Sequence, residues 1–274
     1  MSAVSDAFAT ADRALLVGYL PAGFPSVDAA SDALVAMVSA GVDVVEVGLP
    51  YSDPVLDGPT IATAVEHALR AGTGVDEVLA TVGAVAATGA PSLVMTYWNP
   101  VERRGPARFA AELAAAGGTG VILPDLPVEE SDDWLAAAGR EGLDTVFVVA
   151  PSSTDERLRR VTDRCTGFVY ASAVMGVTGA RDQVGRAAAD LVARVRGVSS
   201  LPVGVGLGVS TPAQAEQVAE FADAVIVGSA FVRRLLDAAD IDAGVTAVAE
   251  LAGDLATGVR AAGRRAGVPA GPGR

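Results

Sequence analysis

The chain has 274 residues, a formal net charge of −13 and 51% hydrophobic residues, with 31 glycines and 15 prolines. This length suits one large domain or two small ones, and the acidic balance argues against nucleic acid or an anionic membrane surface as a partner. No apolar run is long enough to cross a membrane, and the first ten residues lack the pattern of a secretion signal. We therefore expect a cytoplasmic protein.

Three residue types that serve many enzymes are absent or nearly so: lysine is missing, and histidine and cysteine occur once each. All 20 residues counted as Lys or Arg are arginines, and His67 and Cys165 are the single histidine and cysteine. Without lysine the chain forms no lysine Schiff base with a carbonyl compound or pyridoxal phosphate, and most zinc sites cannot be assembled. We expect no metal and no cofactor in this chain, and we expect His67 to lie on an ordinary helix face. Acid–base chemistry then falls to carboxylates and tyrosines.

Short apolar runs alternate with amphipathic, alanine-rich segments along the chain. The runs predicted as strands are Ala14–Tyr19, Val42–Val47, Leu93–Thr96, Gly120–Leu123, Thr145–Val149, Gly167–Ala171, Pro202–Gly206 and Ala224–Val227. The segments predicted as helices are Val27–Ala40, Thr60–Ala71, Val75–Ala87, Pro106–Ala116, Glu130–Glu141, Thr154–Asp163, Arg181–Arg196, Pro212–Phe221 and Ser229 to about Val259. Prolines such as Pro59 mark helix starts, and glycines such as Gly41 mark helix ends.

Eight strands that each precede a helical segment predict an α/β fold, the (β/α)₈ TIM barrel. Residues 1–262 are expected to form this single domain, with a short leading helix in the first ten residues. Residues 263–274, rich in Gly, Pro and Arg, are expected to form a frayed tail. An open doubly wound sheet is the rival architecture, but its Gly-x-Gly-x-x-Gly turn does not follow the first strand.

Two carboxylates belong to the second strand and its loop. Such barrels hold their active sites at the carboxyl ends of the strands. Glu46 lies within an apolar run, so burial is expected to raise its pKa and suit it to proton delivery near neutral pH. The alternative is a buried, paired glutamate without a catalytic role. Asp57 follows on the loop, either as a second catalytic acid or as a helix cap. Asp53, which precedes a proline, is expected to shape the turn.

Glycines follow the last two strands, where these barrels commonly bind phosphate. Gly206-Leu207-Gly208 and Gly228-Ser229 could offer backbone N–H groups at a helix start, or simply make tight turns. The loop of residues 176–179 after the sixth strand is either a mobile lid or a plain connection, and Gly179 could add a contact to the phosphate. Strand-end aromatic residues predict either an aromatic ligand or rim packing: Tyr19, Tyr97, Trp98 and Tyr170.

The sequence VEVGLPYSDPVLDGPTI at residues 45–61 closely resembles the signature of the tryptophan synthase alpha chain family. Further matches follow in order: PDLPVEE at 124–130, GVTG at 176–179, GLGVS at 206–210 and GSA at 228–230. The resemblance implies a barrel lyase that cleaves indole-3-glycerol phosphate to indole and glyceraldehyde 3-phosphate by a retro-aldol reaction. It also implies docking on a beta chain in an alpha2-beta2 heterotetramer, with pyridoxal phosphate in that beta chain.

The resemblance assigns roles to individual residues. It implies catalytic roles for Glu46, Asp57 and Tyr170, phosphate contacts from Gly179, Gly208, Gly228 and Ser229, an indole pocket of Tyr19, Met95, Tyr97 and Leu207, and a mobile loop with Thr178. Ala173-Val174 stands where some members have Ser-Arg, and Phe24 where several have an acid. Two other functions stay open: a sugar-phosphate isomerase on the same scaffold, and a barrel that binds a phosphorylated ligand only to activate a partner.

Overall fold

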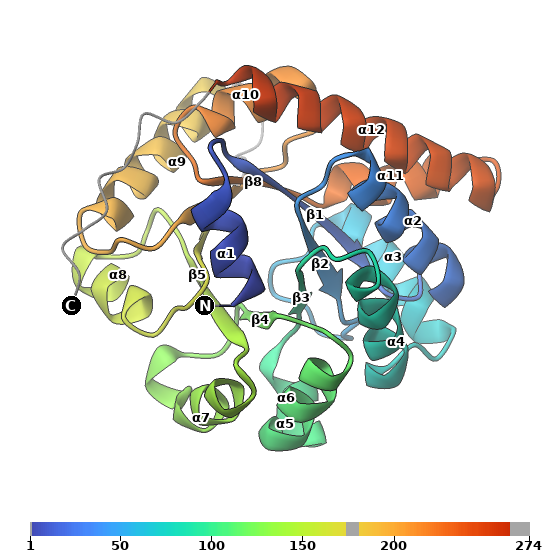
Figure 1. Ribbon diagram of the computed structural model, residues 1–274, viewed down its shortest axis with the longest axis horizontal. Helices are drawn as coiled ribbons and strands as arrows, with labels where there is room; N and C mark the ends of the chain where they lie inside the picture. Colours follow the sequence, from blue (N-terminus) through green and yellow to red (C-terminus); the bar gives the residue numbers. More distant parts are fainter. Residues whose placement is uncertain (1, 174–180, 264–274) are drawn as a thin grey trace.

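The computed structural model describes residues 2–173 and 181–263. Parallel strands form one closed barrel in the order β1 to β8, and β8 pairs back onto β1 (Figure 1). The strands are β1 (Leu15–Pro21), β2 (Val44–Gly48), β3 (Ser92–Met95), β4 (Gly120–Leu123), β5 (Asp144–Val149), β6 (Val169–Ser172), β7 (Val203–Gly206) and β8 (Ala224–Val227). The predicted barrel is confirmed, and each strand lies where the apolar runs predict it.

Helices surround the barrel (Figure 1). They are α1 (Ala3–Thr10), α2 (Val27–Ala40), α3 (Pro59–Arg70), α4 (Val75–Ala86), α5 (Trp98–Arg104), α6 (Pro106–Ala115), the 3₁₀ helix η1 (Val128–Glu130), α7 (Asp132–Glu141), α8 (Asp155–Thr162), α9 (Arg181–Arg196), α10 (Pro212–Ala219), α11 (Ser229–Asp237) and α12 (Ile241–Ala261). None of the helices in residues 2–173 and 181–263 is both long and apolar enough to span a membrane.

Two helix predictions need correction. Helix α5 begins shortly after β3, in a stretch where the sequence predicts no helix. Its first N–H group, on Trp98, donates to the Asp125 carboxylate at 2.9 and 3.1 Å. The last helical segment is divided, because Asp240 adopts an extended conformation and its side chain accepts the N–H of Ala243 at 2.8 Å. A side-chain acceptor of this kind starts a new helix and makes α12 separate from α11.

The leading helix closes the amino-terminal end of the barrel. Val4 and Phe8 of α1 pack on inward-facing strand residues, and the Phe8 and Phe168 rings lie 5.6 Å apart. Figure 1 shows α1, in dark blue, lying across the opening. With this end filled by apolar side chains, the opposite end, at the carboxyl ends of the strands, is left for a ligand.

The strand register brings Glu46 to that open end. Side chains two residues apart on a strand face the same side, and Val44 belongs to the cluster inside the barrel. Glu46 therefore also faces inward, one layer closer to the carboxyl end. Its register partners are Tyr19 on β1 and Leu93 on β3. Sequence periodicity alone thus directs this carboxyl group into the interior.

Candidate active site

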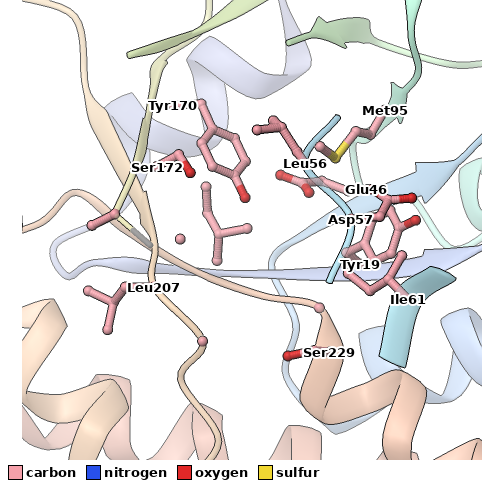
Figure 2. A pocket seen from close by; sticks show the side chains of 15 residues that line it. Tyr19, Glu46, Leu56, Asp57, Ile61, Met95, Tyr170, Ser172, Leu207 and Ser229 are labelled. Atoms are coloured by element: carbon pink, nitrogen blue, oxygen red, sulfur yellow. The ribbon is translucent and has the colours of Figure 1, made fainter. Parts of the chain in front are cut away.

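A cavity of about 350 Å³ opens at the carboxyl ends of the strands. Six strands or the loops after them contribute to its wall, as does the loop that precedes α3 (Figure 2). Its lining consists of Tyr19, Glu46, Leu56, Asp57, Ile61, Met95, Tyr170, Ser172, Ala173, Gly206, Leu207, Gly208, Ile226, Gly228 and Ser229. The structure therefore brings together most of the residues singled out from the sequence.

Glu46 is the most deeply buried acid of the cavity. Its exposed fraction is 1%, and neither carboxyl oxygen has a hydrogen-bond partner in the described structure. Burial raises its pKa to about 8, because the charged form loses its hydration without receiving a cation or donor in return. The alternative of a buried, paired glutamate is thus ruled out for the described residues. Glu46 is protonated at neutral pH and can give up that proton within the cavity.

Asp57 does not cap the helix that follows it. The N-cap position of α3 is Gly58, with Pro59 in the first turn, and no side chain makes a capping hydrogen bond there. Asp57 Oδ1 instead accepts a hydrogen bond from the Tyr97 hydroxyl at 3.2 Å. Burial raises the Asp57 pKa, and the Tyr97 hydrogen bond opposes that rise. Asp53, by contrast, is exposed and accepts the Ser52 hydroxyl at 2.6 Å, as a turn residue can.

Tyr97 is bonded to a residue that lines the cavity, Asp57, but is not itself among the lining residues. Its direct contact with an aromatic ring stays a prediction from the sequence. Its own ring packs against that of Tyr51, with centroids 5.2 Å apart, and its hydroxyl binds the loop that carries Asp57. The other three residues of the expected aromatic pocket, Tyr19, Met95 and Leu207, do line the cavity.

Glycines at the strand ends make room for the two cavity tyrosines. A Cβ on Gly206 would lie 2.6 Å from the Tyr170 hydroxyl, and a Cβ on Gly48 would overlap the Tyr19 ring. A Cβ on Gly228 would come within 3.1 Å of the same ring. Two of these positions belong to the segments assigned to phosphate from the sequence. Space for tyrosine is therefore a second physical reason for glycine there.

The proposed phosphate corner lies where β7 and β8 end. Gly208 has a φ of +78°, a conformation that favours glycine, and Gly228 is the N-cap residue of α11 without a side-chain cap. Ser229 begins that helix and faces the same cavity (Figure 2). The first N–H groups of a helix lack partners within the helix and attract anions. Thr178, Gly179 and Val174 lie outside the described residues, as does the expected tail from residue 264 on.

Four lining residues were not predicted from the sequence. Leu56 and Ile61 flank the Asp57 loop, while Ser172 and Ile226 come from β6 and β8. Strand alternation could have found two of them, because Ser172 lies two residues after Tyr170 and Ile226 two before Gly228. The positions of Leu56 and Ile61 depend on the path of the loop between β2 and α3, which the sequence does not predict. All but Ser172 are aliphatic, so the cavity suits a partly apolar ligand.

The remaining chemically active side chains lie elsewhere. His67 is exposed on α3, with Nε2 3.2 Å from the Pro25 carbonyl oxygen and its ring edge-on to Phe24. Cys165 is buried, and its sulfur accepts the Phe147 N–H at 3.4 Å. In residues 2–173 and 181–263, no three His, Cys, Asp or Glu side chains gather in a metal-binding arrangement.

Fold and site together place the chain in the class of (β/α)₈-barrel proteins, with a cavity at the carboxyl ends of the strands that Glu46 and Asp57 line. The tryptophan synthase alpha chain family model matches residues 6–260. Tryptophan synthase alpha chains of Acidothermus cellulolyticus and Streptomyces coelicolor are each 60% identical to this chain, over 90% of it and 92% of the relative. The chain therefore belongs to the tryptophan synthase alpha chain family.

Solved structures agree with this assignment. Tryptophan synthase from M. tuberculosis, in an aminoacrylate-bound form, superposes with a TM-score of 0.87 at 49% identity, covering 95% of this chain and 100% of that one. The alpha subunit from Legionella pneumophila superposes with a TM-score of 0.86 at 30% identity, covering 95% and 99%. The match covers nearly the full length of the relatives, so the whole barrel is shared.

Proposed function

We propose that this chain performs the lyase reaction of its family with Glu46 as the proton donor. As a tryptophan synthase alpha chain, it cleaves indole-3-glycerol phosphate to indole and D-glyceraldehyde 3-phosphate, a step of tryptophan biosynthesis. One observation carries the proposal at residue level: a buried glutamic acid without a hydrogen-bond partner faces the cavity, and its pKa is raised to about 8. Such a group holds a proton at neutral pH and can still release it.

The first step protonates the indole ring. Glu46 transfers its proton to the ring carbon that bears the glycerol side chain, and the ring becomes an iminium-like cation. This cation withdraws electrons from the bond that must break. Because the Glu46 carboxyl group makes no competing hydrogen bond, its proton is available to the substrate.

Asp57 stabilises the positive charge as it develops. An ionised carboxylate there can accept the ring N–H and bring a negative charge close to the cation. Asp57 is half-buried at the cavity wall, where an electrostatic interaction is stronger than in water. Glu46 thus acts as the general acid, and Asp57 acts as the anion that stabilises the cation.

The second step breaks the carbon–carbon bond. A carboxylate removes the proton from the hydroxyl on the carbon attached to the ring, and that carbon becomes the aldehyde of glyceraldehyde 3-phosphate. The electron pair of the broken bond returns to the ring and neutralises the cation, giving indole. Glu46, deprotonated in the first step, can act as this carboxylate and so regain its proton. Tyr170 lies half-buried in the same cavity, and desolvation raises its pKa, so its hydroxyl is protonated and can donate to a substrate oxygen.

The phosphate would bind at the start of α11. Gly208, Gly228 and Ser229 line the cavity there, and the helix N-terminus supplies a positive potential without any basic side chain. Gly179 is assigned to the same contact from the resemblance alone. The aromatic ring would lie among Tyr19, Met95 and Leu207, beside the two acids.

The chain acts with a tryptophan synthase beta chain in an alpha2-beta2 assembly. We assign pyridoxal phosphate to that beta chain, in keeping with the absence of lysine here. We place the assembly in the cytoplasm.

The direct test is product formation. The purified chain, with and without a tryptophan synthase beta chain, is incubated with indole-3-glycerol phosphate, and indole is measured. Indole and glyceraldehyde 3-phosphate should appear in equal amounts. If neither mixture yields indole, the proposed function is wrong, whatever phosphorylated compounds the chain binds.

A further inference from the structure

The hydroxyl of Tyr97 joins three consecutive residues of the loop between β2 and α3. Its oxygen lies 3.2 Å from the amide nitrogens of Val55 and Leu56 and 3.2 Å from Oδ1 of Asp57. We infer that Tyr97 is a positioning residue, which holds Asp57 oriented and ionised for the reaction. This inference rests on the proposed function of Asp57, and it gives Tyr97 a role in place of direct ligand contact.

The hydrogen-bonding capacity of the phenol fixes the direction of each bond. A tyrosine hydroxyl has one proton to donate and two lone pairs to accept with. Backbone N–H groups only donate, so those of Val55 and Leu56 occupy both lone pairs. The single proton then points to Asp57, and Asp57 must be the acceptor. A protonated Asp57 gains less from this arrangement than a carboxylate, because hydrogen bonds to a charged acceptor are the stronger ones.

Tyr97 is itself held rigidly. Its exposed fraction is 5%, its ring packs on Tyr51, and the N–H of the next residue, Trp98, is bound by the Asp125 carboxylate. The pKa of Tyr97 is raised to about 12, mainly by burial, so the hydroxyl keeps its proton throughout the pH range of an enzyme assay. The donor is therefore both fixed in place and always present.

The loop that it holds is otherwise poorly anchored by packing. Val55 is 69% exposed and Leu56 is 44% exposed, although both are large hydrophobic residues. Asp57 follows them directly, so the position of its carboxylate depends on the path of these two residues. A hydroxyl that binds both amides and the carboxylate restricts all three at once.

The electrostatic surroundings leave few other ways to keep Asp57 ionised. The titratable groups that face the cavity beside it are Glu46, Tyr19 and Tyr170, which are neutral or acidic. The described cavity lining includes no basic side chain. Burial raises the pKa of Asp57, and the Tyr97 hydroxyl is the group that acts in the opposite direction. Hydrogen bonding by a neutral phenol replaces the salt bridge that would usually do this.

The test is a double-mutant cycle in the complex with a beta chain. Tyr97→Phe keeps the ring and removes the hydroxyl; it should lower kcat/KM for indole-3-glycerol phosphate by about tenfold, the scale of a lost hydrogen bond to a charged group. The pH at which kcat/KM falls off on the acidic side of the pH–rate profile should be higher in Tyr97→Phe than in the parent. In an Asp57→Asn background, Tyr97→Phe should cause almost no further loss, because residues that act as a unit are not additive. Tyr51→Phe is the matched control and should leave kcat/KM and its pH profile unchanged.

A second readout does not depend on turnover. With ¹³C-labelled aspartate, the Asp57 carboxyl resonance, assigned by its absence in Asp57→Asn, should titrate at a higher pH in Tyr97→Phe than in the parent. An unchanged titration midpoint would overturn the inference. So would equal fold losses from Tyr97→Phe with and without Asp57, since the tyrosine would then act independently. Activity in the unsubstituted chain shows that the proposed function holds in either case, so the two failures are distinguishable.

Discussion

Tyr19 and Glu46 are register partners across β1 and β2, and both side chains line the cavity. The pKa of Tyr19 is raised well above its usual value, first by burial and then by the nearby acids Asp57 and Glu46. Tyr19 therefore stays neutral. Glu46 keeps its proton because burial removes the hydration that its charged form needs, and the described cavity lining supplies no basic side chain in its place.

Replacing Glu46 by glutamine should abolish most of the turnover and leave the fold intact. Glu46→Gln preserves the shape of the side chain but has no proton to give, so kcat should fall by about 10²–10⁴-fold, the usual range for a general acid or base. Indole release measures the loss, and circular dichroism measures the fold. A rate close to that of the parent would mean that Glu46 has a structural role only.

Glu46 should also make stability depend on pH. Its pKa is about 8 in the folded chain and 4.5 in an unperturbed glutamate, so between those pH values the folded state binds one more proton than the unfolded state. Stability is then lost as pH rises through this window, by up to ~1.4 kcal/mol per pH unit. Urea unfolding of the parent and Glu46→Gln at several pH values isolates this effect. The parent should lose more stability than the variant between pH 5 and 8, and parallel curves would contradict the raised pKa.

The sequence predicts the barrel and its deepest acid well, for a simple reason. Both depend on local periodicity: apolar strands alternate with helices, and Glu46 shares a strand face with Val44. The glycines at the ends of β7 and β8 can also be read directly from the sequence, although their packing against Tyr170 and Tyr19 cannot. Features set within one element can be predicted from that element alone.

Features that depend on two distant segments could not be predicted. The choice between a cap and a catalytic role for Asp57 depends on Tyr97, 40 positions further along the chain. The start of α5 depends on Asp125, 27 positions from Trp98. In each case the two partners lie in different segments of the chain, and only the folded barrel brings them together. The sequence marks Tyr97 as a strand-end aromatic residue, but it cannot show that the Tyr97 hydroxyl binds Asp57.

Gly206 should be intolerant of even a methyl group. A Cβ there would lie 2.6 Å from the Tyr170 hydroxyl, so Gly206→Ala must displace that ring or the strand. We expect Gly206→Ala to reduce kcat/KM by roughly tenfold, the cost expected from an active-site misplacement well below 1 Å. Gly139→Ala is the matched control, because a Cβ there meets nothing within 4 Å.

The Gly206 effect can be traced to Tyr170. In Tyr170→Phe the hydroxyl is gone, and the nearest ring atoms would lie 3.1 Å from the new Cβ, so Gly206→Ala should cost less there than in the parent. Steady-state kinetics of the four variants measure the difference. If Gly206→Ala lowers kcat/KM by the same factor in both backgrounds, it acts through the backbone of β7 and not through Tyr170.

A charge at position 228 tests the phosphate corner. Gly228→Asp puts a carboxylate at the N-cap of α11, where it can occupy the free N–H groups and repel an anion. We expect binding of glyceraldehyde 3-phosphate to weaken by about tenfold or more, measured by calorimetry. The Cβ alone would approach Tyr19 at 3.1 Å, so Gly228→Ala is needed as the steric control. If Gly228→Asp binds the phosphorylated ligand as well as Gly228→Ala does, the start of α11 is not the phosphate site. If Gly228→Asp loses much more affinity than Gly228→Ala, and this difference disappears for a ligand without a phosphate, the phosphate binds at the start of α11.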